Sequence, residues 1–396
     1  MKRVSILGST GSVGRQTLEV VRRYPERFRV VALAAGKNVE LLAEQIRRTR
    51  PSLVSVADAS SVDDLARRLD GIPKPEILHG EAGAIAVARA ESDVVMASMV
   101  GAAGLPPTLA AVEAGRDVAL ANKEVLVMAG ALVTAAAAKS GSRLLPVDSE
   151  HCALHQVLAG RPADQVKRLV LTASGGPFLD LPQSEFAAIT PERAIKHPRW
   201  DMGAKISIDS STLLNKGFEM IEAAWLFGIP IDRIGIVVHP EAIVHSLVDF
   251  VDGSTIAQLG LPDMAVPIGY ALSFPDRLAA LVPHANLAEL GTLHFREPDH
   301  ARFPALELAC AAMRTGGSAP AALVAADDVA VDAFLRHLIT FPAITTLLEN
   351  VLRAEPVRPI TTLADVRAAA ASARATAERL ISDLGSTAVA ASTGRI

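Results

Sequence analysis

The chain has 396 residues, which is more than one hydrophobic core usually supports, so its length predicts two or three domains. Half of the residues are apolar and 21% are charged, a profile typical of a well-packed soluble protein. The formal net charge of -4 offers no basic footprint, so we expect neither nucleic acid nor an anionic membrane as a partner. An anionic substrate would have to be held by local groups.

The two cysteines, Cys152 and Cys310, are too few for a disulfide framework, which favours a reducing compartment such as the cytoplasm. Lys2 and Arg3 precede an apolar run, but that run is short and ends in glycine. We therefore interpret it as a first strand and not as a secretory leader. No apolar run reaches the length of a membrane span.

Short β-branched runs alternate with amphipathic segments from the N-terminus to residue 147. This alternation predicts an α/β fold with a Rossmann-like, doubly wound parallel sheet. Helices are expected at segments such as Thr17–Arg23 and Val39–Arg48. The expected strands are Val4–Leu7, Val30–Ala34, Leu53–Val56, Val94–Ala97, Val118–Leu120 and Leu144–Val147.

The sequence GSTGSVG, residues 8–14, follows the first strand and opens a helix. Glycines at such a turn allow the backbone to approach a pyrophosphate, whose charge meets the free N–H groups of the helix N-terminus. The second strand ends in AAGKN, where a cation can accommodate a 2′-phosphate. Lys37 therefore points to NADP, although a solvated lysine at a helix start is the alternative.

Four motifs fall near the expected domain junction: ANKE (121–124), PVDSEH (146–151), TASGGPF (172–178) and a long run at 197–228. We expect Asp148 and Glu150 to point the same way from an extended segment, with Ser149 opposite. Together with Glu219 they give three hard oxygen donors suited to Mg²⁺ or Mn²⁺. The alternative makes Asp148 or Ser149 a helix cap and Glu150 an acid of the first turn.

In the long run, Ser210 and Ser211 are expected to cap a helix that continues through Trp225. The spacing of Asn215, Lys216 and Glu219 places them on one face of that helix. Taken alone, this pattern favours a weak ion pair on the protein surface. His151 and His155 are four apart, but they lack the glutamate of a zinc-protease motif and are more often a packed pair.

Beyond residue 148 the pattern predicts a central α+β domain, then a linker and a C-terminal helical domain. The expected boundaries are 1–147, 148–274, 275–304 (linker) and 305–396. A DG turn at Asp252 and Gly253 predicts a hairpin. The expected strands are Leu169–Ala173, Ile234–Val238, Val244–Phe250 and Thr255–Leu259. The expected helices are Ala301–Met313, Pro320–Leu338, Ile344–Leu352 and Leu363–Leu380, with a frayed C-terminal end.

These motifs occur in the order found in the 1-deoxy-D-xylulose 5-phosphate reductoisomerase family, which the chain resembles over nearly its whole length. The shared stretches include ILGSTGSVG, LANKE, LLPVDSEH, ASGGPF and HPRWDMGAKISIDSSTLLNKGFEMIEA. The resemblance implies an NADPH-dependent enzyme of the methylerythritol phosphate route to isoprenoids. Its reaction rearranges 1-deoxy-D-xylulose 5-phosphate by retro-aldol and aldol steps and then reduces an aldehyde to give 2-C-methyl-D-erythritol 4-phosphate. A cytoplasmic homodimer is also implied.

The resemblance assigns a role to each matching residue. The implied metal ligands are Asp148, Glu150 and Glu219, which with Lys123 form the catalytic set. The implied substrate contacts are Lys123, Ser149, Glu150, Ser174, His197, Trp200, Ser210, Asn215, Lys216 and Glu219. The implied NADPH contacts are Thr10, Gly11, Ser12, Val13, Gly36, Lys37, Asn38, Asn122, Glu124 and Gly203.

A few positions depart from the family pattern or lie outside its site. His155 is expected to pack, whereas His151 and His245 match family histidines with supporting roles. Asp327 and Asp328 stand where relatives have Asn-Glu, a change expected to affect packing or subunit contacts more than catalysis. Leu179 replaces an arginine that some relatives carry, which puts one loop contact in doubt.

Two other classes of protein remain as alternatives. A semialdehyde-type NADP-dependent reductase would need a nucleophilic cysteine with a basic partner, and Cys152 beside His151 is the candidate. A non-catalytic NADPH-binding regulator would predict loss of the acidic residues or of Lys123, and all of them are present.

Overall fold

The computed structural model describes the backbone of residues 1–196 and 203–393, with side chains as far as residue 382. It divides into two compact units, each formed by three separate segments of the chain. Unit 1 comprises residues 1–125, 131–160 and 258–289. Unit 2 comprises residues 126–130, 161–257 and 290–396. The boundaries of these two units therefore differ from the expected domain boundaries.

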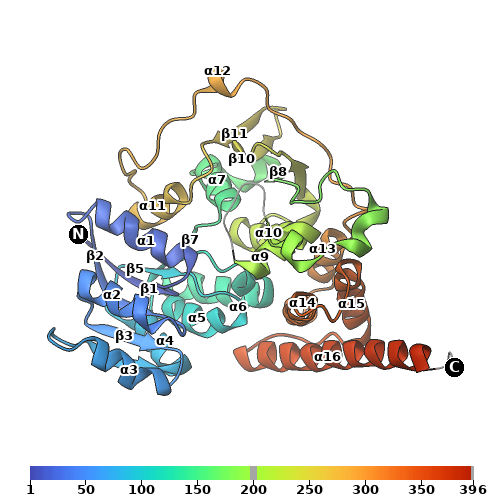
Figure 1. Ribbon diagram of the computed structural model, residues 1–396. Helices are drawn as coiled ribbons and strands as arrows, with labels where there is room; N and C mark the ends of the chain where they lie inside the picture. Colours follow the sequence, from blue (N-terminus) through green and yellow to red (C-terminus); the bar gives the residue numbers. More distant parts are fainter. Residues whose placement is uncertain (197–202, 394–396) are drawn as a thin grey trace. The chain divides into compact units, whose positions relative to one another are not determined.

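Unit 1 contains a seven-stranded parallel sheet in the order β4-β3-β2-β1-β5-β6-β7, as the strand-helix alternation predicted (Figure 1). The strand order reverses between β1 and β5, and ligands bind at such a switch point in doubly wound sheets. The strands are β1 (Lys2–Leu7), β2 (Phe28–Ala34), β3 (Leu53–Val56), β4 (Glu76–His79), β5 (Val94–Ala97), β6 (Asp117–Leu120) and β7 (Leu144–Pro146).

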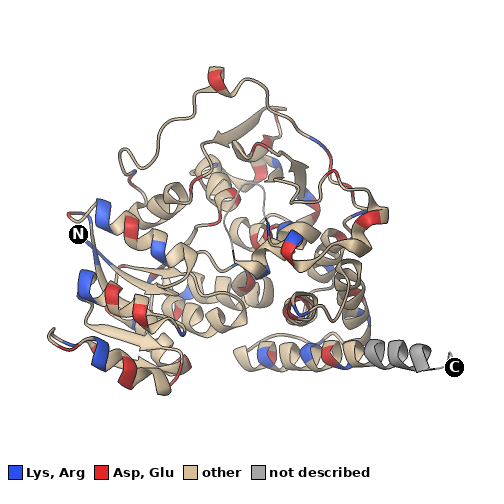
Figure 2. Cartoon of the chain, in the orientation of Figure 1, with Lys and Arg blue, Asp and Glu red and all other residues tan. Residues whose placement is uncertain are grey.

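Helices pack on this sheet in two groups. The helix α4 packs against α5, and α1 packs against α11, whose Ile268, Ala271 and Leu272 join one buried core with residues of α1, α2 and α3. Figure 2 shows that acidic and basic residues alternate along α1, α2 and α3. The helices of unit 1 are α1 (Ser12–Arg23), α2 (Val39–Thr49), α3 (Ser60–Arg68), α4 (Gly80–Arg89), α5 (Leu105–Glu113), α7 (Ser149–Leu158) and α11 (Ala265–Ser273), while α6 (Glu124–Ser140) has residues in both units.

The second sheet has the order β11-β10-β8-β9, with β10 antiparallel and β9 parallel to β8. The predicted DG hairpin is confirmed, because the Phe250 N–H donates to the Ser254 carbonyl at 2.8 Å and Gly253 has a φ of 89°. The strands are β8 (Val166–Ala173), β9 (Ile234–Val238), β10 (Val244–Phe250) and β11 (Thr255–Leu259).

Among the helices of unit 2, α13 to α16 form the predicted helical C-terminal part. The helix α10 packs against β8, β9 and α13, and α14 packs against α15 and α16. None of the described helices is long and apolar enough to cross a membrane. The helices are α8 (Pro191–Ala194), α9 (Ala204–Thr212), α10 (Leu214–Phe227), α13 (Ala305–Thr315), α14 (Ala319–Leu335), α15 (Phe341–Ala354) and α16 (Leu363–Thr393), while the short α12 (Leu287–Leu290) lies at a unit boundary.

Two local predictions were wrong. Ser149 and Glu150 do not continue an extended segment but begin α7, with Asp148 in extended conformation at its N-cap position. Ser210 and Ser211 do not cap a long helix either, because they form the last turn of α9. Leu213, with a φ of 62°, separates α9 from α10.

Candidate active site

The glycine-rich turn follows β1 at the switch point of the sheet. A Cβ added at Gly8 would lie 2.6 Å from the Ser98 carbonyl oxygen, and one at Gly14 would lie 2.2 Å from the Gly8 carbonyl oxygen. These positions therefore tolerate only glycine. Gly11 occupies the N-cap position of α1 without a side chain to cap it, so the first N–H groups of the helix can meet an anion.

The predicted 2′-phosphate residues lie beside this turn. The N–H groups of Gly8 and Ser9 both donate to the Ala34 carbonyl oxygen at 2.9 Å, which fixes the turn against the end of β2. Gly36, Lys37 and Asn38 come next and are exposed. The Asn38 side chain accepts a hydrogen bond from the Leu41 N–H at 3.1 Å and so caps α2. Lys37 precedes this cap and is exposed.

Asn122 holds the loop that follows β5. Its buried side-chain amide donates to the carbonyl oxygens of Met99 and Gly101, the latter at 2.9 Å, and its oxygen accepts the Val125 N–H at 3.2 Å. Asn122 therefore ties the loop after β5 to the start of α6. Glu124 begins α6 and is also buried.

Lys123 and Asp148 form a partly buried ion pair with an Nζ–Oδ2 distance of 2.7 Å, and their side chains are only 7% and 20% exposed. The Ser149 hydroxyl donates to a Glu150 carboxylate oxygen at 2.5 Å. One carboxylate oxygen of Asp148 and one of Glu150 lie within 4.8 Å of each other. Two hard oxygen donors this close, in a half-buried setting, fit a divalent cation such as Mg²⁺ or Mn²⁺.

The Asp148 side chain also lies near a histidine. His151 is fully buried, and its Nδ1 lies 4.0 Å from an Asp148 carboxylate oxygen. His155, four residues on, contacts the Tyr270 hydroxyl at 2.7 Å and packs edge-on against Phe274. Burial lowers the pKa of His155. The two histidines therefore do not face a common site, and His155 packs as expected.

In unit 2, Asn215, Lys216 and Glu219 share one face of α10, as their spacing predicted. Asn215 donates to one carboxylate oxygen of Glu219 at 2.6 Å, and the Lys216 ammonium donates to the other. The Lys216 and Glu219 side chains are only 6% and 2% exposed. The group is therefore no solvated surface pair, because burying a carboxylate and an ammonium is costly unless they are paired.

Gly176 lies close to both Ser174 and Ser210. Ser174 directly follows β8, and its hydroxyl accepts the Gly176 N–H at 3.3 Å. A Cβ added at Gly176 would lie 2.7 Å from the Ser210 carbonyl oxygen in α9. Gly203 occupies the exposed N-cap position of α9. His197 and Trp200 lie outside the residues that the structure describes.

Sequence reasoning missed a charged cluster at the start of α9. The Lys205 ammonium lies 2.6 Å from Asp209 and 2.5 Å from Asp327, two carboxylates that are almost fully buried. Asp327 thus contacts the helix that carries Ser210, whereas Asp328 pairs with Arg374 at 3.4 Å. The four-residue spacing of Lys205 and Asp209 is a local signal, but no local signal points from Asp327 on α14 to Lys205.

Neither cysteine has the surroundings of a nucleophile. Burial raises the pKa of the Cys152 thiol to about 12 and that of Cys310 to about 11. Cys310 instead contacts the Met220 sulfur at 3.7 Å. A thiolate is the reactive form of cysteine, so these thiols are unsuited to attack on an aldehyde.

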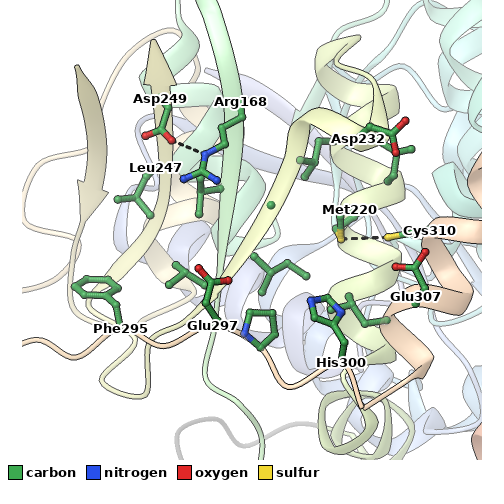
Figure 3. Close-up of a pocket in the computed structure, with 18 of the residues that line it drawn as sticks. Arg168, Met220, Asp232, Leu247, Asp249, Phe295, Glu297, His300, Glu307 and Cys310 are labelled. Carbon is green, nitrogen blue, oxygen red and sulfur yellow. Dashed lines mark hydrogen bonds and ion pairs between the residues drawn. The ribbon is translucent and has the colours of Figure 1, made fainter. Parts of the chain in front are cut away.

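A separate groove of about 540 Å³ lies on the face of the second sheet (Figure 3). Its walls come from β8, β9, β10, residues 295–300 and α13, and include the Arg168–Asp249 ion pair at 2.6 Å. Among the predicted site residues that the structure describes, none lines this groove.

Comparison with known proteins gives consistent matches along the chain. Family models described as 1-deoxy-D-xylulose 5-phosphate reductoisomerase, its C-terminal domain and the DXP reductoisomerase C-terminal domain match residues 4–130, 144–227 and 259–376. The reductoisomerase of Chlorobium phaeovibrioides is 55% identical over 89% of this chain and 92% of its own length. That of Anaeromyxobacter sp. is 52% identical over 96% and 97%.

Solved structures of the same family share the fold. The reductoisomerase from Zymomonas mobilis in complex with NADPH has a TM-score of 0.90 at 42% identity and covers 96% of this chain and 99% of its own. A DOX-P reductoisomerase in complex with NADPH, fosmidomycin and magnesium has a TM-score of 0.91 at 38% identity and covers 97% and 99%.

Proposed function

Because the chain belongs to the 1-deoxy-D-xylulose 5-phosphate reductoisomerase family, we propose that the Lys123–Asp148–Glu150 group performs the family's chemistry in this protein. The protein is an NADPH-dependent enzyme that converts 1-deoxy-D-xylulose 5-phosphate to 2-C-methyl-D-erythritol 4-phosphate. The observation that carries the residue assignment is the Lys123–Asp148 ion pair, next to Ser149 and Glu150 at the carboxyl end of the parallel sheet.

NADPH is the reductant and supplies a hydride when bound. We assign its pyrophosphate to the N–H groups of Thr10, Gly11, Ser12 and Val13, where glycine spacing and the helix N-terminus favour a negative charge. The exposed ammonium of Lys37, flanked by Gly36 and Asn38, would meet the 2′-phosphate. Asn122, Glu124 and Gly203 are the remaining proposed contacts.

A divalent metal is the second cofactor, and two solved structures of the family are complexes with magnesium. Asp148, Glu150 and Glu219 are the residues proposed to hold it. Asp148 and Glu150 belong to unit 1, whereas Glu219 belongs to unit 2. When bound, a divalent cation would act as a Lewis acid that offsets negative charge on substrate oxygens.

Lys123 is the proposed proton-handling residue. Its ammonium is buried and already aligned by Asp148, so it can donate a hydrogen bond to a substrate oxygen without a large loss of side-chain entropy. Ser149 would bond a substrate hydroxyl. The phosphate group would be held by Ser174, His197, Ser210, Asn215 and Lys216, and its binding energy would help to exclude water from the reacting part of the substrate.

The family assignment also suggests the protein's assembly and location. We propose a cytoplasmic homodimer on the strength of the resemblance, and the two unpaired cysteine thiols agree with a reducing compartment. The thiohemiacetal chemistry of a semialdehyde-type reductase is disfavoured by the raised pKa of Cys152.

One spectrophotometric assay tests this function. Purified protein should oxidise NADPH only when 1-deoxy-D-xylulose 5-phosphate and Mg²⁺ or Mn²⁺ are both present, and a chelator should stop the reaction. The product should co-migrate with 2-C-methyl-D-erythritol 4-phosphate. Oxidation of NADPH without the sugar phosphate, or undiminished turnover after chelation, would contradict the assignment.

A further inference from the structure

The segment from Ser174 to Leu181 has an unusually constrained backbone. Gly175 and Gly176 have φ values of 85° and 68°, in the region that favours glycine. The Leu179 side chain fills the space over Gly175, where an added Cβ would lie only 2.8 Å from it. Gly176 is pressed against the Ser210 carbonyl, as described above. The position of Ser174 therefore depends on how residues 175–181 fold back.

One side chain satisfies the carbonyl groups of this returning part. Arg302 donates from Nη1 to the Leu179 carbonyl oxygen at 2.9 Å and from Nη2 to the Phe178 carbonyl oxygen at 2.9 Å. Nη2 also donates to the Leu181 carbonyl oxygen. Residues 178–181 belong to no strand or helix, and apart from the Leu181 N–H, which donates to the Phe178 carbonyl oxygen at 3.2 Å, the guanidinium supplies the donors that a hydrogen-bonded ladder would.

Arg302 is itself held rigidly. Its guanidinium lies over the rings of Phe186 and Phe303, at 5.5 and 5.1 Å from their centroids. Its backbone N–H donates to the Asp299 side chain at 3.0 Å, and its own side chain is only 20% exposed. A planar guanidinium fixed in this way can set the loop conformation with little further loss of entropy.

We propose that Arg302 is a positioning residue for the phosphate end of the substrate site, acting through the loop that carries Ser174. This inference rests on the proposed function, in which Ser174 and Ser210 bind the substrate phosphate. Without Arg302, the loop would adopt the conformation described here for only part of the time. The apparent affinity for the substrate is then the intrinsic affinity multiplied by that fraction of time. Saturating substrate restores that conformation, so KM rises and kcat is retained.

The chain offers a matched control in Arg233. This arginine also binds two backbone carbonyls of unit 2, those of Lys167 at 3.0 Å and of Val166, but at the opposite end of β8. Arg302→Lys removes guanidinium contacts with the loop that follows β8, whereas Arg233→Lys removes similar contacts at the start of β8. A lysine keeps the charge but cannot span several carbonyls in a fixed fork.

The experiment compares steady-state kinetics and amide hydrogen exchange of the substrate-free enzyme for both variants, with Arg302→Gln as a second loop variant. We expect Arg302→Lys and Arg302→Gln to raise KM for 1-deoxy-D-xylulose 5-phosphate about tenfold, as the loss of two of the three hydrogen bonds would. Their kcat and NADPH affinity should stay within about twofold of wild type, and exchange should quicken in residues 175–181. Arg233→Lys should change neither KM nor exchange in that loop.

Two results would overturn the role of Arg302. One is an unchanged substrate KM together with unchanged exchange in residues 175–181. The other is an equal loss of kcat, NADPH affinity and thermal stability, shared by Arg233→Lys, which indicates a general structural role. Hydrogen exchange needs no substrate, so its result separates failure of this inference from failure of the proposed function.

Discussion

Lys37 and Lys216 are both lysines assigned to phosphate groups, but their surroundings differ. Lys37 is exposed after β2, whereas the Lys216 side chain is only 6% exposed and contacts Glu219. An exposed ammonium can meet the 2′-phosphate of an incoming cofactor without first giving up a partner. The buried ammonium of Lys216, already paired with Glu219, can instead help to bind a phosphate only in a site that is already formed.

The role of Lys37 predicts cofactor selectivity. Lys37→Ala should raise KM for NADPH about tenfold or more, because a charged hydrogen bond to phosphate is lost. KM for NADH should hardly change, since NADH lacks that phosphate. Lys74→Ala, which removes an exposed lysine paired with Asp70 at 2.8 Å, serves as the control. Equal losses for both cofactors would refute the 2′-phosphate role.

At this scale, spacing predicted contacts within an element and failed between elements. Asn215, Lys216 and Glu219 meet because residues three and four apart share a helical face. Their burial was not predictable, since it comes from the packing of α10 against β8, β9 and α13. Asp327 reaches Lys205 across 122 positions, and no local pattern encodes that contact.

Among the secondary-structure elements, the strands were the best predicted. Leu53–Val56, Val94–Ala97, Ile234–Val238, Val244–Phe250 and Thr255–Leu259 were expected with the bounds that the structure has. The edge strand β4 was missed because it has only four residues, all at least partly exposed, of which two, Ile77 and Leu78, are apolar. The break between α9 and α10 was missed because Leu213, neither glycine nor proline, adopts the left-handed conformation there.

The Lys205 cluster predicts how strongly α9 is tied to α14. Lys205→Met should lower the free energy of unfolding of unit 2 by about 3 kcal/mol, because it removes the ammonium that two buried carboxylates contact. Arg353→Met, which breaks an exposed pair with Glu349 in the same unit, should cost less than about 1 kcal/mol. Thermal denaturation of the two variants checks this; equal Tm losses would contradict it.

For the whole molecule, the sequence indicated a parallel sheet followed by a mixed and then a helical part, but not the way in which the chain returns to unit 1. Residues 258–289 belong to unit 1, where α11 fills the core and the Lys2 ammonium donates to the carbonyl oxygens of Leu272 and Phe274 at 3.2 and 2.7 Å. Such pairings of distant segments depend on tertiary contacts that neither periodicity nor turn chemistry reports.

The proposed metal ligands come from both compact units, so substitution of one ligand in each unit tests the metal site most directly. Asp148→Asn changes a carboxylate of unit 1, and Glu219→Gln changes one of unit 2. Asp276→Asn is the matched control, because Asp276 is an exposed carboxylate of unit 1 paired with Arg27 at 2.7 Å.

The measurement is Mn²⁺ affinity, followed by turnover and NADPH binding of the same samples. Asp148→Asn and Glu219→Gln should each weaken Mn²⁺ binding and turnover by about a hundredfold or more, since losing a ligand costs at least as much as losing a supporting residue. NADPH affinity should stay within about twofold, and Asp276→Asn should behave as wild type. Wild-type Mn²⁺ affinity and turnover in either ligand variant would contradict the account.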